Sequence, residues 1–487
     1  GDDHANQENT IKGVEAYLCR FCGCIHATAL QVCLGCGRAD KLVALTALRW
    51  NDDNPGYMTS CPGCGTPGRN WGTSYREPAR PVRAVAVSDV HVLAQNMIQF
   101  AERPRLLVFA DNRQEAAFQA GWMKDHARRF RLRALMDQLL REAPRSVGDL
   151  TAELDRRLEG DDNLSRSLAP EVWRFHRKEG AGVEHRNERK VFLRIMVLRE
   201  ITTGLKQRIG LEPWGRLVVH YLGLEPDLPF FQSWAKVLNL EPERLRDGVA
   251  AVLDRERRHM ILLDREGKLF SRFWMDGDLP IQRGYIPRLS GVPTGLKIQR
   301  TGDDDKGRVA QWISARGQTA FRQDIRAWGV SDADVEQFVK ELWKLLTQDL
   351  RLLAPVTLQG ARGNPLPRCS DVRQVDADQL LLQSHKGRWR CQSCRRSQIR
   401  PTPRDACMAY RCSGTLIFEQ EDPDNYDLVA LDRGYAMVKP EEHSAQVPAE
   451  QRDRIERSFK GDGDAINTLV CTPTLELGID IGGLDAV

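Results

Sequence analysis

Two short and mostly apolar runs, Leu106–Phe109 and Thr468–Cys471, stand out from the polar sequence around them. Such runs, bounded by turn residues, are typical of strands buried in a parallel sheet. A polar stretch follows each run, at 111–113 and in the letters TPTLELGID. Open α/β sheets bind ligands at the carboxyl ends of their parallel strands. The pattern therefore predicts an α/β lobe in which both polar stretches lie at the ligand-binding edge of one sheet.

Helical periodicity dominates the sequence between these two runs. A helix is predicted from Gln114 onward, with an apolar stripe formed by Ala117, Phe118 and Gly121. The chain is then expected to remain mostly helical up to about Arg390, as an insertion that starts with KDHARRFRLRALMDQLLREA. Four arginines in that segment form a basic stripe that favours either a solvated surface or a nucleic-acid contact, and they are Arg128, Arg129, Arg131 and Arg133.

Two later segments have the order of elements found in a winged helix. The first, LRDGVAAVLDRERRHMILLDREGKLFSRFW, predicts a helix followed by two strands around a Glu-Gly turn. The second predicts a helix and strand in DADVEQFVKELWKLLTQDLRLLAPVTLQG and a return strand in VRQVDADQLLLQ. Such modules either brace a nucleic-acid duplex or dock proteins. Trp274, Trp328 and Trp343 are expected in the core, and TGDDDKG near Asp303 is expected to be a mobile surface loop.

Length and composition add bounds to this picture. At 487 residues the chain is too long for one core, and about three domains are expected. Hydrophobic residues make up 41% and charged residues 28%, which is ordinary for a folded protein. The net charge of +4 permits a local basic face without requiring one. Without a long apolar run or a signal pattern, a cytoplasmic protein with no membrane partner is expected.

Thirteen cysteines in a chain without a secretion signal favour metal binding over disulfides. The N-terminal region holds three CxxC pairs: Cys19, Cys22, Cys33, Cys36, Cys61 and Cys64. Two such pairs complete one tetrahedral zinc site, and a glycine after a pair permits the left-handed turn that points backbone N–H groups at the sulfurs. The remaining pair either binds no metal or forms a second site with Cys24 and His26. At least one zinc ion is predicted here, and the pairing stays open.

A second cysteine cluster lies in CQSCRRSQIRPTPRDACMAYRC, and it comprises Cys391, Cys394, Cys407 and Cys412. Four cysteines within a short loop rich in proline and arginine are typical of a structural zinc ribbon. Because cysteines would fill the coordination sphere, no position is left for a reactive water, so we expect a structural metal. The isolated Cys369 and Cys471 are expected to be core thiols.

Three segments carry a resemblance to a known family. LLVFADNRQEAA resembles motif IV of superfamily 2 helicases, CTPTLELGIDIG resembles their motif V, and EEHSAQVPAEQRDRIERSFKGD resembles the stretch between them. Together they are similar to the second RecA-like lobe of the MrfA/DruE/DrmA-like group of large prokaryotic DExH helicases, with its cysteines and its long insertion between these motifs. The resemblance covers about the first and last fifths of the chain counted from Leu106, and motif V is its most specific part.

The resemblance implies an ATP-dependent DNA helicase or translocase of antiphage defence or DNA repair, with ATP and Mg²⁺ as cofactors besides Zn²⁺. It implies nucleic-acid contacts for Asn112, Arg113, His443, Ser444, Thr472 and Thr474. It also implies nucleotide coupling for Glu476, Gly478 and Asp480, with Asp480 nearest the ATP ribose. Taken singly, Asn112 is also typical of a turn, Asp480 of a helix cap and His443 of a solvated surface.

The chain departs from the family in three motifs. It contains no GxxxxGK[ST] pattern, no DExH box and no QxxGRxGR arginine-finger motif. We therefore expect a fragment of a longer helicase that does not hydrolyse ATP alone, with DNA, the remainder of the same polypeptide and defence or repair subunits as partners. A scaffold that binds nucleic acid or protein through zinc modules, with a non-hydrolysing lobe, is the alternative. A zinc nuclease or deaminase is disfavoured because the HxE signature is lacking.

These expectations divide the chain into five parts. A zinc-knuckle domain is predicted at 1–80, and a mainly α insertion of winged-helix type at 128–384. A zinc ribbon is predicted at 385–420. The RecA-like lobe is predicted in two pieces, at 81–127 with motif IV and at 421–487 with motif V.

Overall fold

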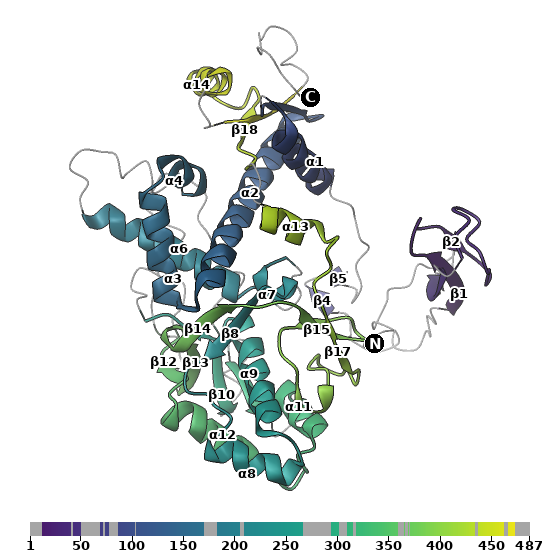
Figure 1. Cartoon of the computed structure of the whole chain (residues 1–487), viewed down its shortest axis with the longest axis vertical. Coiled ribbons are helices and arrows are strands. Elements are labelled where there is room, and N and C mark those ends of the chain that lie inside the picture. The colour runs from purple at the N-terminus through teal and green to yellow at the C-terminus, as the bar shows by residue number, and fades with distance from the viewer. Residues whose placement is uncertain are drawn as a thin grey trace, which may run out of the picture. The chain divides into compact units, whose positions relative to one another are not determined.

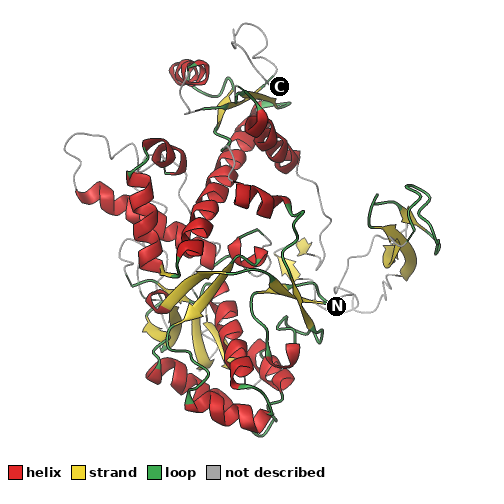
Figure 2. Cartoon of the chain, in the orientation of Figure 1, coloured by secondary structure: helices red, strands yellow, loops and turns green. Residues whose placement is uncertain are grey.

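The chain forms two compact units, Gly1–Arg83 and Ala84–Val487 (Figure 1). The computed structural model describes residues 12–39, 42–49, 69–71, 74–76, 86–102, 104–169, 183–204, 209–265, 294–300, 309–314, 318–358, 365, 369, 371–433, 437–461 and 466–472. Within these ranges the first unit consists of strands and loops, whereas the second mixes helices and strands (Figure 2). None of the described helices combines the length and the apolar character needed to cross a lipid bilayer.

The first unit is built on an antiparallel sheet in the order β2-β1-β3. Its strands are β1 (Lys12–Cys19), β2 (Ile25–His26) and β3 (Leu42–Arg49). The pairing of Cys19 with Leu42 closes the long β1–β3 ladder at the point where the first CxxC turn begins. A separate small hairpin joins β4 (Arg69–Trp71) to β5 (Ser74–Arg76).

Three strands of the second unit form a parallel sheet in the order β18-β19-β6. They are β6 (Leu106–Phe109), β18 (Pro440–His443) and β19 (Thr468–Cys471). The two strands predicted from apolar runs are therefore confirmed with their expected bounds, and they are direct neighbours. Thr468 pairs with Leu106, and Cys471 pairs with Phe109.

Alternating side chains give this sheet a separate core on each face. On one face Leu106 and Val470 pack against α1 (Ala86–Phe100) and α2 (Arg113–Glu142). On the other face Leu107, Leu469 and Cys471 pack against Ile455 and Phe459 of α14 (Ala449–Lys460). Helices on both faces of a parallel sheet are the architecture expected of an α/β lobe.

Helix α2 corrects the expected apolar stripe. The helix begins at Arg113, and Phe118 is 56% exposed while Gly121 is exposed as well. Its buried face consists instead of Ala116, Ala120, Met123 and Ala127. Three neighbouring residues do not fix the phase of a helix, whereas this longer series with spacings of three and four does. The same helix continues without interruption to Glu142, past the domain boundary placed after residue 127.

The basic stripe on α2 is largely occupied by partners within the protein. Arg128 is buried and donates two hydrogen bonds to the carbonyl oxygen of Leu168. Arg133 forms an ion pair of 2.7 Å with Glu200. Arg129 pairs with Asp125 one turn earlier on α2, at 2.8 Å. Arg128 and Arg133 therefore hold α2 against neighbouring elements and Arg129 pairs within the helix, so these three side chains do not form a continuous free surface for a polyanion.

Beyond the parallel sheet, one large hydrophobic core joins helices to two further sheets. The antiparallel sheet β7-β14-β8 contains β7 (Arg145–Ser146), β8 (Leu217–Tyr221) and β14 (Leu380–Ser384). Helices α3 (Val147–Glu159) and α7 (Leu211–Trp214) lie beside it, and α4 (Asp162–Leu168) and α6 (Val183–Ile201) pack on α3. A mixed sheet contains β9 (Leu262–Leu263), β10 (Gly295–Gln299), β11 (Val309–Ile313), β12 (Leu353–Val356) and β13 (Val372–Asp376).

The two segments with winged-helix order form their expected elements only in part. In the first, α9 (Pro242–Arg258) leads to β9, which pairs in parallel with β13, and the predicted second strand falls outside the described residues. In the second, α12 (Val335–Lys344) precedes β12, which pairs antiparallel with β13 as predicted. The predicted return strand, however, breaks at a short 3₁₀ turn, and its second half is β14 of the other sheet.

Two of the tryptophans expected in the core can be placed. Trp328 is fully buried in α11 (Ala320–Trp328), and Trp343 is partly buried against the ring of Trp312. Trp274 and the loop near Asp303 lie outside the described residues. The chain also forms α8 (Pro229–Leu238), which packs its aromatic side chains against α12.

The second cysteine cluster lies in a small antiparallel sheet in the order β16-β15-β17. Its strands are β15 (Arg388–Cys391), β16 (Ser397–Gln398) and β17 (Leu416–Glu419). Helix α13 (Tyr426–Arg433) follows and leads back to the parallel sheet. This ribbon has its own small core, which includes Cys391, Cys407 and Leu416.

Candidate metal centres and sheet-edge site

The four cysteines of the ribbon formed by β15, β16 and β17 converge as predicted. The sulfurs of Cys391, Cys394, Cys407 and Cys412 all lie within 4.8 Å of one another. The Cys391–Cys412 sulfurs are 3.7 Å apart and the Cys394–Cys407 sulfurs 3.6 Å apart. Four sulfurs bound tetrahedrally at about 2.3 Å from a zinc ion would be about 3.8 Å apart. The geometry therefore fits one zinc ion.

Backbone groups of this ribbon support thiolate ligands. The N–H of Cys394 donates to the Cys391 sulfur, and the N–H of Ala409 donates to the Cys407 sulfur, each at 3.4 Å. Burial raises the pKa of Cys391, but the N–H groups of Cys394 and Ser393 together with the neighbouring thiols lower that pKa to about 7, whereas burial raises the pKa of Cys394 and Cys407. Arg395 and Arg411 have left-handed backbone angles, at φ 60° and 63°. Arg395 follows Cys394 in the position that glycine takes after each CxxC pair of the N-terminal cluster, whereas Arg411 precedes Cys412.

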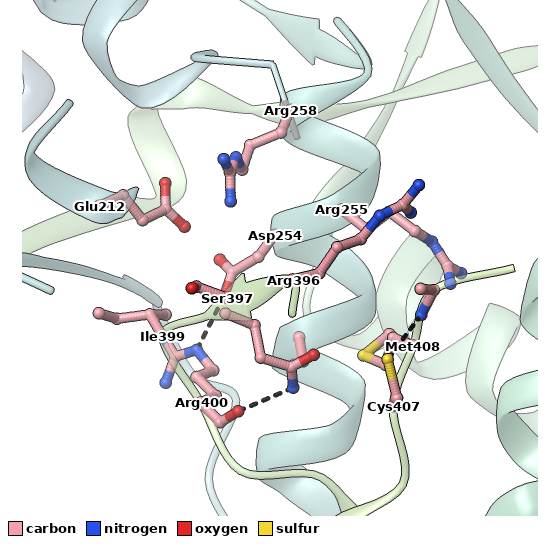
Figure 3. Close-up of a pocket in the computed structure, with 13 residues that line it drawn as sticks. Glu212, Asp254, Arg255, Arg258, Arg396, Ser397, Ile399, Arg400, Cys407 and Met408 are labelled. Atoms are coloured by element: carbon pink, nitrogen blue, oxygen red, sulfur yellow. Dashed lines mark hydrogen bonds and ion pairs between the residues drawn. The ribbon is translucent and has the colours of Figure 1, made fainter. Parts of the chain in front are cut away.

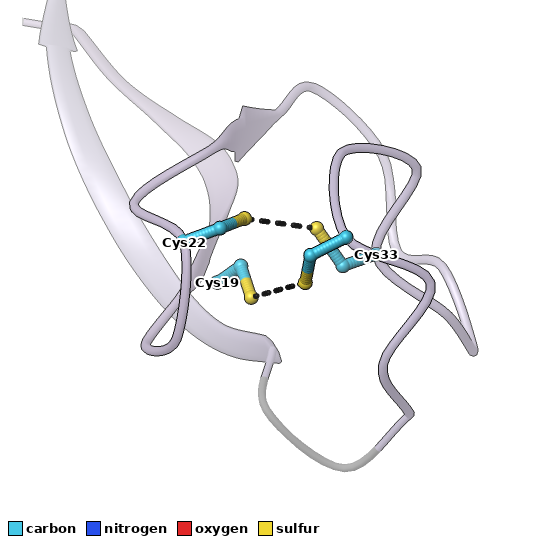
Figure 4. Close-up of side chains that lie close together, drawn as sticks. Cys19, Cys22 and Cys33 are labelled. Atoms are coloured by element: carbon cyan, nitrogen blue, oxygen red, sulfur yellow. Dashed lines mark hydrogen bonds between the residues drawn. The ribbon is translucent and has the colours of Figure 1, made fainter.

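The N-terminal cluster uses the first two CxxC pairs, which settles the pairing of these four thiols. The sulfurs of Cys19, Cys22, Cys33 and Cys36 lie within 4.8 Å of one another (Figure 4). Gly23 and Gly37 follow the two pairs with φ of 77° and 70°, as predicted for the knuckle turns.

Cys24 and His26 stay outside this four-thiol set. The Nε2 atom of His26 lies 3.3 Å from the Cys33 sulfur, where its N–H can donate to a metal-bound thiolate. The third pair, Cys61 and Cys64, lies outside the described residues. Cys369 and Cys471 are buried and lie in neither cluster, as expected of core thiols.

The carboxyl ends of β6, β19 and β18 meet at one edge of the parallel sheet. Asn112 follows β6, and its side-chain oxygen accepts a hydrogen bond of 2.9 Å from the backbone N–H of Glu115. It is therefore the N-cap of α2, and Arg113 is the first helical residue and is exposed. Thr472 follows β19, and His443 ends β18. The topology brings together residues that are far apart in sequence.

Three of the residues at this edge are buried. The His443 Nε2 atom lies 2.7 Å from Glu456 of α14. The Ser444 hydroxyl donates to Glu442 at 2.5 Å and accepts from the backbone N–H of Gln446. Thr472 is 5% exposed. The exposed polar side chains described at this edge thus include those of the loop before α2 and Gln446 after β18, whereas Thr474, Glu476, Gly478 and Asp480 lie outside the described residues.

A buried charge network was missed by sequence reasoning. The last turns of α9 carry five consecutive charged residues that are all buried: Asp254, Arg255, Glu256, Arg257 and Arg258. Arg257 has no exposed surface and donates to Glu212 at 2.9 Å and to Asp254 at 3.0 Å. A run of charges near a helix end usually marks a solvated surface, so the sequence offers no local signal for this burial.

Comparisons with known proteins leave these sites to be interpreted from their own geometry. No protein-family model, no curated protein and no solved structure matches the chain. What the residues establish is a mixed α/β fold with a parallel sheet and two four-cysteine clusters that could hold zinc.

Proposed function

We propose that the protein contributes the second motor lobe of an ATP-dependent DNA helicase or translocase, with its zinc ribbons as structural modules. The observation that carries the proposal is the parallel pairing of β6 with β19. It brings the carboxyl ends of these two strands to one sheet edge, where α/β folds bind ligands, and the segments that resemble motifs IV and V begin in these strands. The sequences of these segments supply the resemblance, and the adjacency of the two strands supports it.

The described loop offers suitable chemistry for a phosphate group. Arg113 is exposed at the first turn of a 30-residue helix, and Asn112 is exposed beside it. The N-terminus of a helix carries unpaired backbone N–H groups and a partial positive charge, which favour an anion. Contacts of this kind are independent of base sequence, as a translocating enzyme requires. ATP bound between this lobe and its partner lobe would supply the free energy for closure.

Binding of labelled DNA to the purified chain at several salt concentrations tests the proposal. We expect single-stranded DNA to bind with an affinity that falls as salt rises. Arg113→Gln should weaken binding and reduce the slope of log K against log salt by about 0.7, the value for one lost contact with a single strand. Lys236→Gln on α8 removes an exposed charge at a distant element and serves as the control. A slope of zero, or equal slopes for both variants, would contradict the proposal.

The burial of His443 and Ser444 favours a second candidate function. Both side chains are bonded to glutamates of the lobe, as expected if the sheet edge were a structural element. The protein would then be a zinc-dependent scaffold that binds nucleic acid or protein with a non-hydrolysing lobe. Photo-crosslinking of an azido-ATP analogue to the intact protein separates the two functions. A labelled peptide from 472–487 would favour the motor, and labelling that leaves this segment unmodified would favour the scaffold.

A further inference from the structure

A pocket lies between helix α9 and the ribbon formed by β15, β16 and β17 (Figure 3). Helix α9 contributes Ala251, Asp254, Arg255 and Arg258 to its lining. The ribbon contributes residues 396–400 and 407–409, and α7 contributes Glu212. Buried hydrogen bonds fix the walls relative to one another, since Arg400 of the ribbon bonds Asp254 of α9 at 3.1 Å. The pocket is therefore part of the folded second unit.

The carboxylates that line the pocket already have cationic partners. Both oxygens of Glu212 accept from Arg257, at 2.9 and 3.1 Å. Asp254 accepts from Arg257 through one oxygen and from Arg400 through the other. Little negative charge is left to repel an anion in the pocket.

Two lining arginines, in contrast, have no carboxylate within ion-pair distance among the described residues. Arg258 donates to carbonyl oxygens only, those of Thr203 at 2.7 Å and Gly204 at 3.4 Å. Arg396 is exposed, and no side-chain contact fixes its guanidinium within the described ranges. The two guanidinium groups come from opposite walls, one from α9 and one from the ribbon (Figure 3).

The zinc centre next to the pocket does not cancel this positive charge. Four thiolates and one Zn²⁺ carry a net charge of −2, and Cys407 lines the pocket. The ribbon from Arg388 to Glu419, however, contains seven arginines and only two acidic residues, Asp405 and Glu419, of which Glu419 pairs with Arg388 and Arg390. The electrostatic field on the ribbon side therefore favours an anion.

The remaining lining residues indicate which group of a ligand would lie beside its anionic group. Ala251, Ile399 and Met408 are apolar, and the Ser397 hydroxyl lies on the same wall as Arg396. From these contacts we infer that the pocket binds a small organic oxyanion, a phosphate monoester or carboxylate with a compact apolar body. Arg258 and Arg396 would bind the anionic group from two sides, because guanidinium groups suit both oxyanions. The apolar body would lie against Met408.

Methyl NMR of the whole zinc-loaded chain with ¹³C-methyl methionine tests this site. The Met408 signal is assigned by its loss in Met408→Leu. Phenyl phosphate and benzoate are the probes for the two oxyanion classes, and phenol is the uncharged control. We expect a saturable shift of the Met408 signal with at least one oxyanion and none with phenol. The absence of a saturable shift with both oxyanions, or an equal shift with phenol, would overturn the inference.

Arginine variants test whether Arg258 and Arg396 contact the bound oxyanion. Arg396→Gln should raise the Kd of the bound probe at least tenfold, because it removes one of the two guanidinium groups. Arg395→Gln removes a neighbouring exposed charge that does not line the pocket, and it should leave Kd within twofold. Arg258→Lys is a second variant that keeps the buried charge but loses the planar donors. Unchanged affinity in both Arg396→Gln and Arg258→Lys would refute the site, whatever the DNA-binding result.

Discussion

At the scale of single residues, His91 is held in an unusual state. It is 2% exposed in α1, and neither ring nitrogen has a hydrogen-bond partner in the described part of the chain. Its ring contacts Trp122 and His126 of α2, with centroids 5.7 and 4.7 Å away. Burial, followed by the nearby His126, lowers the pKa of His91 to about 3. Burial and the charges of Arg133 and Arg129 likewise lower the pKa of His126 to about 4, against the opposing effect of Asp125.

This pKa makes stability depend on pH in a definite direction. Below pH 6.5 the unfolded chain binds a proton at His91, whereas the folded chain stays neutral there down to about pH 3. The free energy of unfolding should therefore fall as pH is lowered from 7, by about 2 kcal/mol at pH 5 from this residue. In denaturant unfolding, the free energy of unfolding of His91→Leu should depend less steeply on pH than that of the wild type. Equal slopes would mean that His91 titrates normally.

Asn112 has a stabilising role that is separate from any ligand. Its side chain caps α2 through the N–H of Glu115. Asn112→Ala should lower the free energy of unfolding by about 1 kcal/mol, whereas Asn112→Ser, which can cap the helix, should lower it by much less. Urea denaturation followed by circular dichroism measures both. A loss of the same size in the two variants would indicate that the cap bond contributes little.

At the scale of elements, two glycines let α7 and β8 approach the ribbon closely. Gly215 ends α7 with φ of 84°, and a Cβ there would lie 2.4 Å from the carbonyl oxygen of Gly387. Gly215→Ala should therefore destabilise the second unit by roughly 2 kcal/mol or more. Gly121→Ala is the matched control, since Gly121 lies inside α2 with no other atom near its Cβ direction, and alanine there should stabilise by about 0.5–1 kcal/mol. Thermal unfolding should show shifts of opposite sign.

Elements with a local sequence signal were predictable, and those that depend on distant partners were not. Strands β6 and β19 have the predicted bounds because a short apolar run between polar turns is the local sequence signal of a buried strand. The phase of α2 was wrong because its buried face is chosen by the sheet and by α1. The break between β13 and β14 likewise arises from two sheets that compete for one segment.

The candidate sites divide in the same way. Paired cysteines carry their chemistry in their spacing, so both four-thiol clusters were predictable, although the choice of the first two pairs required the fold. The pocket beside α9 was not predictable, because Arg258 and Arg396 come to line one pocket only when the ribbon packs on the helix. At the sheet edge, the resemblance implied nucleic-acid contacts for His443 and Ser444. Both are buried instead, bonded to Glu456 of α14 and Glu442 of β18.

At the scale of the whole molecule, zinc should matter unequally to the two units. The described buried side chains of the first unit gather at its cysteines, with Cys19 and Cys33 fully buried. The second unit has a large core that is distinct from the small core of its ribbon, although Ala406 and Met408 of the ribbon pack against it. Elemental analysis should find at least two zinc ions per chain. A strong chelator should then unfold the first unit and the second ribbon while most of the helical circular dichroism remains.

Single substitutions assign the metal to its ligands. Cys391→Ser should remove about one equivalent of zinc, because it deletes a buried ligand of a closed site. Cys369→Ser changes a buried thiol outside both clusters and should leave the zinc content unchanged. Equal zinc content in the two variants would show that the second cluster holds no metal.

Helix α2 runs unbroken from the parallel sheet to the sheet that contains β14. Its 30 residues correspond to a rod about 45 Å long. A stiff helix behaves as a lever, so a tilt of about 10° at its sheet end would move its far end by roughly 8 Å. A molecule that tilts α2 at its first turn, near Arg113, would thus displace the far end of the helix, beside β14, by several times the movement at the first turn.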